Sequence, residues 1–194
     1  MTLELTPNVD VHRGSSGRIR SLSHAGEPFQ PAGFGPLAPR ELAAEYLREV
    51  APHFQLEDSA LTTLAEKVDG LVREEGVRLR WEREKRVGDV AVEQYAQTYR
   101  GLKVWNSSVA VRVHTGLAGV IGSESQVDPE IHAEMPDLQT APFTPERLSP
   151  ETLRRALNVE TRPDEPVINH VSLVVYQFAP EDRFPEVDPN NPSF

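Results

Sequence analysis

The stretch Tyr95–Ser107, with the sequence YAQTYRGLKVWNS, decides the fold of this chain. Strand-like alternation of apolar and polar residues runs over 90–99 and resumes over 106–114, where valines occupy alternate positions. A Thr115-Gly116 turn then leads to a further short strand over 120–123. We therefore expect a β-hairpin here, within a group of antiparallel strands.

Two other segments have the same character. Val77, Leu79 and Trp81 alternate with arginines, and residues 87–89 offer a turn into the strand over 90–99. Near the N-terminus, a Gly/Ser-rich segment at 13–18 separates two short apolar patterns and predicts a small hairpin. The sequence thus predicts three or four central strands and an N-terminal pair.

Helical patterns follow the proline- and glycine-rich residues 25–39. Over 39–50 the apolar side chains recur with a spacing near 3.6, which predicts an amphipathic helix that ends before Pro52. A second helix is expected from Asp58 or Ser59, and its apolar positions are Leu61, Leu64, Val68, Leu71 and Val72. A third begins at Ser149-Pro150-Glu151 and precedes a strand over 167–178.

These elements predict an α+β fold, in which a curved antiparallel sheet packs on one or two helices and a second small, incomplete α/β unit follows. The expected boundaries are 1–38 for the N-terminal hairpin and linker, 39–126 for the helix-on-sheet domain, 127–144 for a linker, 145–180 for the second unit and 181–194 for a disordered tail.

Composition narrows the function classes. The formal charge of −10 argues against nonspecific binding to nucleic acid. With no cysteine, the chain has no disulfides, thiolate metal sites or cysteine nucleophile. The longest apolar runs are far shorter than the roughly 20 residues of a membrane helix, so no membrane partner is expected.

The sequence contains no motif that favours catalysis. The six histidines are too widely spaced to form a local metal-binding pair. Gly14-Ser15-Ser16-Gly17 is too short for a nucleophile elbow, and no glycine pair completes a phosphate-binding loop. We expect no catalytic residue, no metal site and no cofactor. An assembled site of distant histidines and aspartates remains an alternative, with solvated surface histidines favoured.

Two groups of side chains have both a structural and a functional interpretation. Arg78, Arg80, Arg83, Lys85 and Arg86 form a basic cluster. A solvated face is favoured for them, and contact with an acidic partner surface is the alternative. Tyr95, Tyr99 and Trp105 are expected to pack beneath a helix. Because Trp105 lies outside an ideal alternation, it is the candidate for an exposed anchor on a partner protein.

The pattern Q-T-Y-x-G-L-x-V-x-N-S, followed by alternating valines and a glycine turn, resembles the fungalysin/thermolysin propeptide domain of secreted zinc metalloproteases. The residues that carry this resemblance are Gln97, Tyr99, Gly101, Val104, Trp105, Asn106 and Gly116. Residues 16–22 and the helix over 39–50 add to it. Residues 149–156 and 173–176 resemble the start of a PepSY-like, cystatin-like second subdomain. Lys103 stands where the family often has proline.

The resemblance implies a non-catalytic intramolecular chaperone and inhibitor. Its partner would be the catalytic domain of a cognate metalloprotease, bound in cis or in trans, and the seven motif residues are the candidate docking set. Strand edges near 106–114 or 167–178 are further docking candidates, since unpaired backbone groups can add a partner strand. The expected location is extracellular, with the signal peptide not present in this chain, or cytoplasmic if Met1 is the native start.

Two alternative functions follow from the same residues. The first is a free-standing, propeptide-like module that binds a protein and has no protease attached. The second is a metal-dependent hydrolase with a dispersed His/Asp site.

Overall fold

The computed structural model describes residues 8–24, 26–31, 37–68, 75–131 and 174–176. Contacts divide the chain into one unit of residues 1–131 and 175–194 and a second unit of residues 132–174. The helix expected at 149, most of the strand expected over 167–178 and the tail over 181–194 lie outside the described residues. In the part of the chain that is described, no helix is long and apolar enough to cross a membrane.

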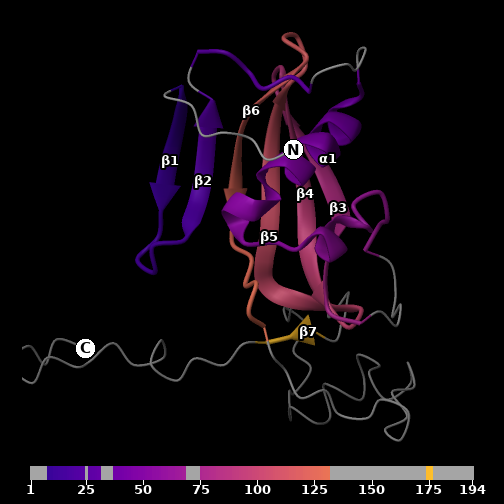
Figure 1. The fold of residues 1–194 in the computed structure, drawn as a ribbon. Helices are drawn as coiled ribbons and strands as arrows, with labels where there is room; N and C mark the ends of the chain where they lie inside the picture. Colours follow the sequence, from indigo (N-terminus) through magenta and orange to yellow (C-terminus); the bar gives the residue numbers. More distant parts are fainter. Residues whose placement is uncertain (1–7, 25, 32–36, 69–74, 132–173, 177–194) are drawn as a thin grey trace, which may run out of the picture. The chain divides into compact units, whose positions relative to one another are not determined.

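The first unit is built on an antiparallel sheet. Its strands are β1 (Val9–Arg13), β2 (Ile19–His24), β3 (Val77–Val87), β4 (Val90–Tyr99), β5 (Leu102–His114) and β6 (Gly119–Ser125). They lie in the order β1-β2-β6-β5-β4-β3 (Figure 1). Off this path, β7 (Val174–Val175) pairs with β5. The predicted hairpins are therefore confirmed, and the N-terminal hairpin extends the sheet by pairing β2 with β6.

One α-helix covers one face of the sheet (Figure 1). This helix, α1 (Pro39–Val50), has the predicted bounds. Proline at the first helical position suits the helix start, and the Glu41 carboxylate accepts a hydrogen bond from the Ala38 N–H at 3.1 Å. The fold is α+β, as the sequence predicts.

The buried stripe of α1 packs against the inward side chains of the central strands. Its buried residues are Leu42, Ala43, Tyr46, Leu47 and Val50, and the sheet contributes Leu22, Leu79, Tyr95, Val109, Val111, Val113 and Val120. Each large apolar side chain contributes roughly 1.5 to 3 kcal/mol on full burial. This contact is the main source of stability for the helix-on-sheet arrangement.

Buried hydroxyl groups fix the helix on the sheet. The Tyr46 hydroxyl lies 3.1 Å from Ser123 Oγ on β6 and 3.1 Å from His24 Nε2 on β2. Burial raises the pKa of Tyr46 to about 12 and lowers the pKa of His24. Both side chains are therefore neutral at pH 7, and α1 is connected by polar contacts to two strands.

The predicted second helix is wrong over its described part. After the 3₁₀ turns η1 (Ala51–Phe54) and η2 (Asp58–Leu61), residues 62–65 form turns and Lys67 forms a β-bridge with Trp81, so the α-helix does not form. The backbone of Glu66 and Val68 bonds to Trp81 instead: Trp81 N–H donates to Glu66 O at 2.9 Å, and Val68 N–H donates to Trp81 O at 3.0 Å. Hydrogen bonds to β3 have replaced those of the expected helix, whose remaining residues, 69–74, lie outside the described part.

The expectation that 106–114 forms a free sheet edge is also wrong. Residues 108–114 pair with β4 on one side, and residues 109–114 pair with β6 on the other. The edges of the sheet path are β1 and β3, and residues 66–68 cover the middle of β3. Since β2 reaches β6 from the far end of the sequence, the local pattern did not reveal this order.

Gly122 allows β2 and β6 to approach closely. A Cβ at this position would lie 2.7 Å from Leu22 O and 2.9 Å from Arg112 Nη2. One of these neighbours is backbone, so it cannot turn away as a side chain can. The close pairing of the N-terminal hairpin with the central sheet therefore requires glycine, which has no side chain, at position 122.

We predict that Gly122→Ala lowers the free energy of unfolding by about 1 to 3 kcal/mol, because the added methyl group overpacks the β2–β6 junction. Urea titration followed by far-UV circular dichroism measures this change. Gly116→Ala is the matched control, since a Cβ at Gly116 has its nearest contact at 3.4 Å, on the His114 ring. Equal stability of the two variants would contradict the prediction.

Candidate partner-docking site

The motif residues begin at the turn between β4 and β5. Tyr99 pairs with Leu102, which leaves Arg100 and Gly101 as a two-residue loop. Both have positive φ, 50° and 82°, as a type I′ hairpin turn requires. The Arg100 N–H donates to Gly76 O at 3.0 Å, which connects the turn to the start of β3. The turn geometry thus explains Gly101.

Directly after this turn, β5 forms a corner, a term we use for residues 104–107. The pairing steps from Thr98–Lys103 to Ala96–Ser108, so Gln97 of β4 stands opposite these four residues of β5. Asn106 has a φ of 53°, a left-handed conformation that asparagine tolerates better than most residues. Val104 and Ser107 are buried. The break in the apolar/polar alternation around Trp105 therefore results from the register shift and the left-handed backbone at Asn106.

Gln97 holds the corner to the segment that follows β6. Its side chain is fully buried. Its Nε2 donates to Asp128 O at 2.6 Å, and its Oε1 accepts from Asp128 N–H at 2.9 Å. The Ser107 hydroxyl contacts Gln97 Oε1 and lies 3.1 Å from Gln126 O, so it can donate to either. One amide side chain thus pairs with the partly buried backbone N–H and C=O of Asp128.

Trp105 is the motif residue that the corner presents to solvent. Its side chain is 56% exposed, whereas its neighbour Val104 is 2% exposed. A large exposed aromatic on a hydrogen-bonded backbone is a good anchor for a partner protein, because little conformational freedom is lost on binding. Tyr176, directly after β7, is a second exposed aromatic that the sequence reasoning did not single out.

The other two motif residues lie outside residues 104–107: Tyr99 closes the turn as the partner of Leu102, and Gly116 lies elsewhere. Tyr99 is half-buried, and the guanidinium of Arg100 lies 5.6 Å from its ring centroid. Gly116 follows His114, at the opposite end of β5 from the corner, and lies against the His114 ring. Of the seven candidates, six therefore belong to the corner or its turn, and Gly116 does not. The six are Gln97, Tyr99, Gly101, Val104, Trp105 and Asn106.

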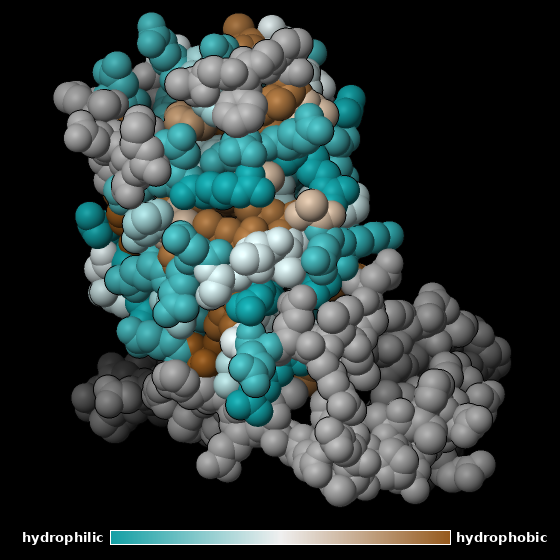
Figure 2. All heavy atoms as spheres, turned by 45° about the vertical axis from the view of Figure 1, so that its right-hand side comes forward, coloured by the Kyte–Doolittle hydropathy of each residue, from teal (hydrophilic) through white to brown (hydrophobic). Residues whose placement is uncertain are grey.

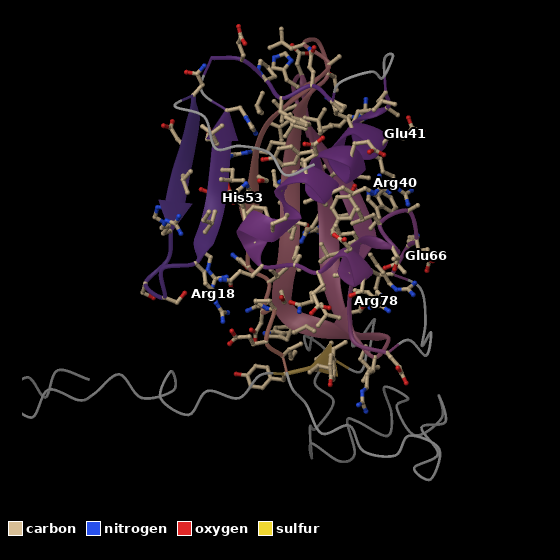
Figure 3. All side chains as sticks on the ribbon, viewed as in Figure 1. Arg18, Arg40, Glu41, His53, Glu66 and Arg78 are labelled. Carbon is tan, nitrogen blue, oxygen red and sulfur yellow. The ribbon has the colours of Figure 1, made fainter. Side chains whose placement is uncertain are left out.

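Sequence reasoning missed a buried acid on β4. Glu93 is fully buried in phase with Tyr95 and Gln97, and this shared phase was the signal available in the sequence. Its Oε2 accepts from Trp81 Nε1 at 2.8 Å, while its Oε1 is buried without a hydrogen-bond partner. Arg40, which Figure 3 shows on α1, has its guanidinium 4.3 Å from the centroid of the Trp81 ring.

The surroundings of Glu93 favour its protonated form. Burial raises the pKa of Glu93, and Glu84, its cross-strand neighbour on β3, adds to this rise against the opposing hydrogen bond from Trp81. A protonated carboxyl at this point can be accommodated between α1 and the sheet. Among the residues that the structure describes, no group of three or more histidines and acids could hold a metal ion.

Comparisons with known proteins give little further information. No protein-family model matches the chain, and no curated protein is similar to it at a significant level. Among solved structures, the chain is similar to the Bacillus megaterium YpeB C-terminal domain, with 12% identity and a TM-score of 0.37. The match covers 66% of this chain and 47% of that one. This similarity is too low to support an argument, so the α+β fold stands on the strands and helix described above.

We predict that Gln97→Leu lowers the free energy of unfolding by about 1 to 3 kcal/mol, because it removes both hydrogen bonds to the partly buried N–H and C=O of Asp128. Chemical denaturation measures the effect. The control is Gln94→Leu, which removes only the hydrogen bond from Arg83 on the exposed part of β3. A loss at Gln97 no larger than that at Gln94 would show that the corner does not depend on this amide.

A second prediction concerns pH. Because the folded chain retains the Glu93 proton to a higher pH than the unfolded chain, Glu93 contributes stability below its ordinary pKa of 4.5 and loses this contribution as pH rises through the raised pKa. Glu93→Gln should remove this pH dependence. The stability of the wild type relative to Glu93→Gln should therefore decrease over the pH range that begins at the ordinary pKa of 4.5 and extends upward. Thermal unfolding over this range, with Glu124→Gln as control, gives the comparison, and parallel wild-type and Glu93→Gln curves would refute it.

Proposed function

We propose that this chain is a non-catalytic, propeptide-type module that assists the folding of a zinc metalloprotease catalytic domain and inhibits it, in cis or in trans. The observation that carries the proposal is Trp105, a 56% exposed indole on a corner built by the motif residues Gln97, Val104 and Asn106. The proposed setting is a secreted precursor.

The physical basis is differential binding. A module that binds the folded protease better than its unfolded or partly folded forms stabilises the folded state by mass action. The same contact restrains the enzyme if it covers or closes the cleft. Both effects need a preformed surface, and the hydrogen bonds between Gln97 and Asp128 keep the Trp105 corner in one conformation.

The finer family assignment belongs to the same proposal. The helix-on-sheet unit would correspond to a fungalysin/thermolysin propeptide domain, and residues 145–180 would begin a PepSY-like, cystatin-like subdomain. The support is the order of the motif residues over 97–116, together with the backbone roles that the structure gives to Gly101 and Asn106.

A second candidate is a free-standing binding module with the same fold and no protease attached. The observation that favours it is again Trp105, since an exposed anchor requires only a partner protein. The two candidates differ in what the surface recognises.

The test is inhibition in trans. Purified chain is added to mature metalloproteases of the thermolysin type, and peptide hydrolysis and the refolding yield of the denatured enzymes are measured. We expect inhibition and a higher yield, with both effects weakened more than about tenfold by Trp105→Ala, as for an aromatic hot spot. Leu117→Ala, which truncates another exposed apolar residue, is the matched control and should have no effect.

Because Trp105 is largely exposed, its replacement should leave the thermal unfolding midpoint close to that of the wild type, so loss of folding does not confound the assay. Inhibition that Trp105→Ala does not weaken would reject the proposed anchor. The absence of inhibition across the panel would favour the free-standing module.

A further inference from the structure

The structure divides the basic cluster of β3 between the two faces of the sheet. In the pairing with β4, Arg83 stands opposite Gln94 and Lys85 opposite Val92, whereas Arg86 stands opposite the buried Ala91. Side chains at directly paired positions project to the same side. Arg83 and Lys85 therefore lie on the face opposite α1, and Arg86 lies on the helix-covered face.

The neighbouring strand adds two more cations to that face. Arg112 of β5 pairs with Val92, and Lys103 pairs with Thr98. Between the cations lie the half-buried residues Val92, Gln94 and Ala110. We name this surface the basic face. Its residues are Arg83, Lys85, Val92, Gln94, Lys103, Ala110 and Arg112.

Charge on the basic face is incompletely neutralised. Lys103 pairs with Glu82, and Arg112 lies 3.4 Å from Glu124, with both cations 38% exposed. Arg83 donates only to the neutral amide of Gln94, at 2.8 Å. Neither Arg83 nor Lys85 has an ion pair within the described part of the chain, although the chain as a whole carries a charge of −10. The basic face therefore carries positive charge, whereas the rest of the chain is acidic and would repel an acidic partner.

The centre of the basic face is formed by short side chains, and the cations surround it. Ala110 and Val92 have short side chains, so the centre of the face is lower than the arginines and lysines around it. Figure 2 shows the neighbouring β3 side of the described unit, where hydrophilic side chains cover most of the surface. None of the seven residues of the basic face is aromatic.

We propose that the basic face binds an acidic polypeptide surface, laid across β3, β4 and β5. Complementary charge gives both the attraction and the orientation, because the exposed cations Arg83 and Lys85 attract an acidic partner to this face. The net charge of −10 opposes binding of a long phosphate polymer, which extends beyond the face and meets the acidic remainder of the chain. This interaction goes beyond the proposed function and requires no protease.

The probe is a short fluorescein-labelled poly-L-glutamate that does not extend beyond the basic face, with binding followed by fluorescence anisotropy at low salt. We expect binding that weakens as sodium chloride is raised. Arg83→Gln/Lys85→Gln should weaken it at least about threefold, as expected for two exposed charge contacts. Arg86→Gln/Arg48→Gln is the matched control. It removes the same charge from exposed arginines, one on the helix-covered face and the other on α1.

Amide shifts in the ¹⁵N spectrum locate the contact and should concentrate in residues 83–85, 92–94 and 110–112. Equal weakening by the two double variants, or the absence of poly-L-glutamate binding, would overturn the proposal. It would also be overturned by tighter binding of heparin or a single-stranded oligonucleotide through Arg83 and Lys85, because the face would then recognise sulfate or phosphate. Thermal unfolding of both double variants confirms that the comparison is made between folded chains.

Discussion

The structure of the first unit depends on how the amide of Gln97 satisfies the backbone of Asp128. At this point β4 contributes one residue to the pairing and β5 contributes four, so the regular ladder cannot continue. Without the Gln97 side chain, the partly buried N–H and C=O of Asp128 would lose these hydrogen bonds, each at a cost of about 0.5 to 1.5 kcal/mol. Together with the contact between the Ser107 hydroxyl and Gln126 O, the Gln97 side chain therefore joins the corner of β5 to the chain that leaves β6.

This constraint also explains the residue types around it. Gly101 and Asn106 occupy left-handed backbone positions, and Val104 fills the core beneath the corner. Because Val104 occupies the buried position of the corner, the adjacent Trp105 side chain is exposed to solvent. Most of the motif residues stabilise the backbone of the turn and the corner, and Trp105 is the residue that we propose contacts a partner. The basic face, on the sheet surface opposite α1, provides a second surface with different chemistry.

Local patterns predicted the parts of the fold that have local causes. The helix over 39–50 and the strand over 90–99 follow from side-chain periodicity, and their bounds agree with the structure. The second helix was wrong because Glu66 and Val68 bond to Trp81, a partner that no local pattern identifies. The edge assignment for 106–114 failed for the same reason, since it depends on the position of β2. Among the candidate site residues, the exposure of Trp105 could be suspected from its broken alternation, whereas the partner of Gln97 could not.

Hydrogen exchange of the Asp128 amide is the most direct measurement of this account. If Gln97 holds the corner, the Asp128 N–H should exchange as slowly as the amides of the central β4–β5 ladder, because both open only when the sheet opens. Exchange at the rate of an exposed loop would show that the corner opens independently. It would contradict the claim that Trp105 is presented on a fixed surface.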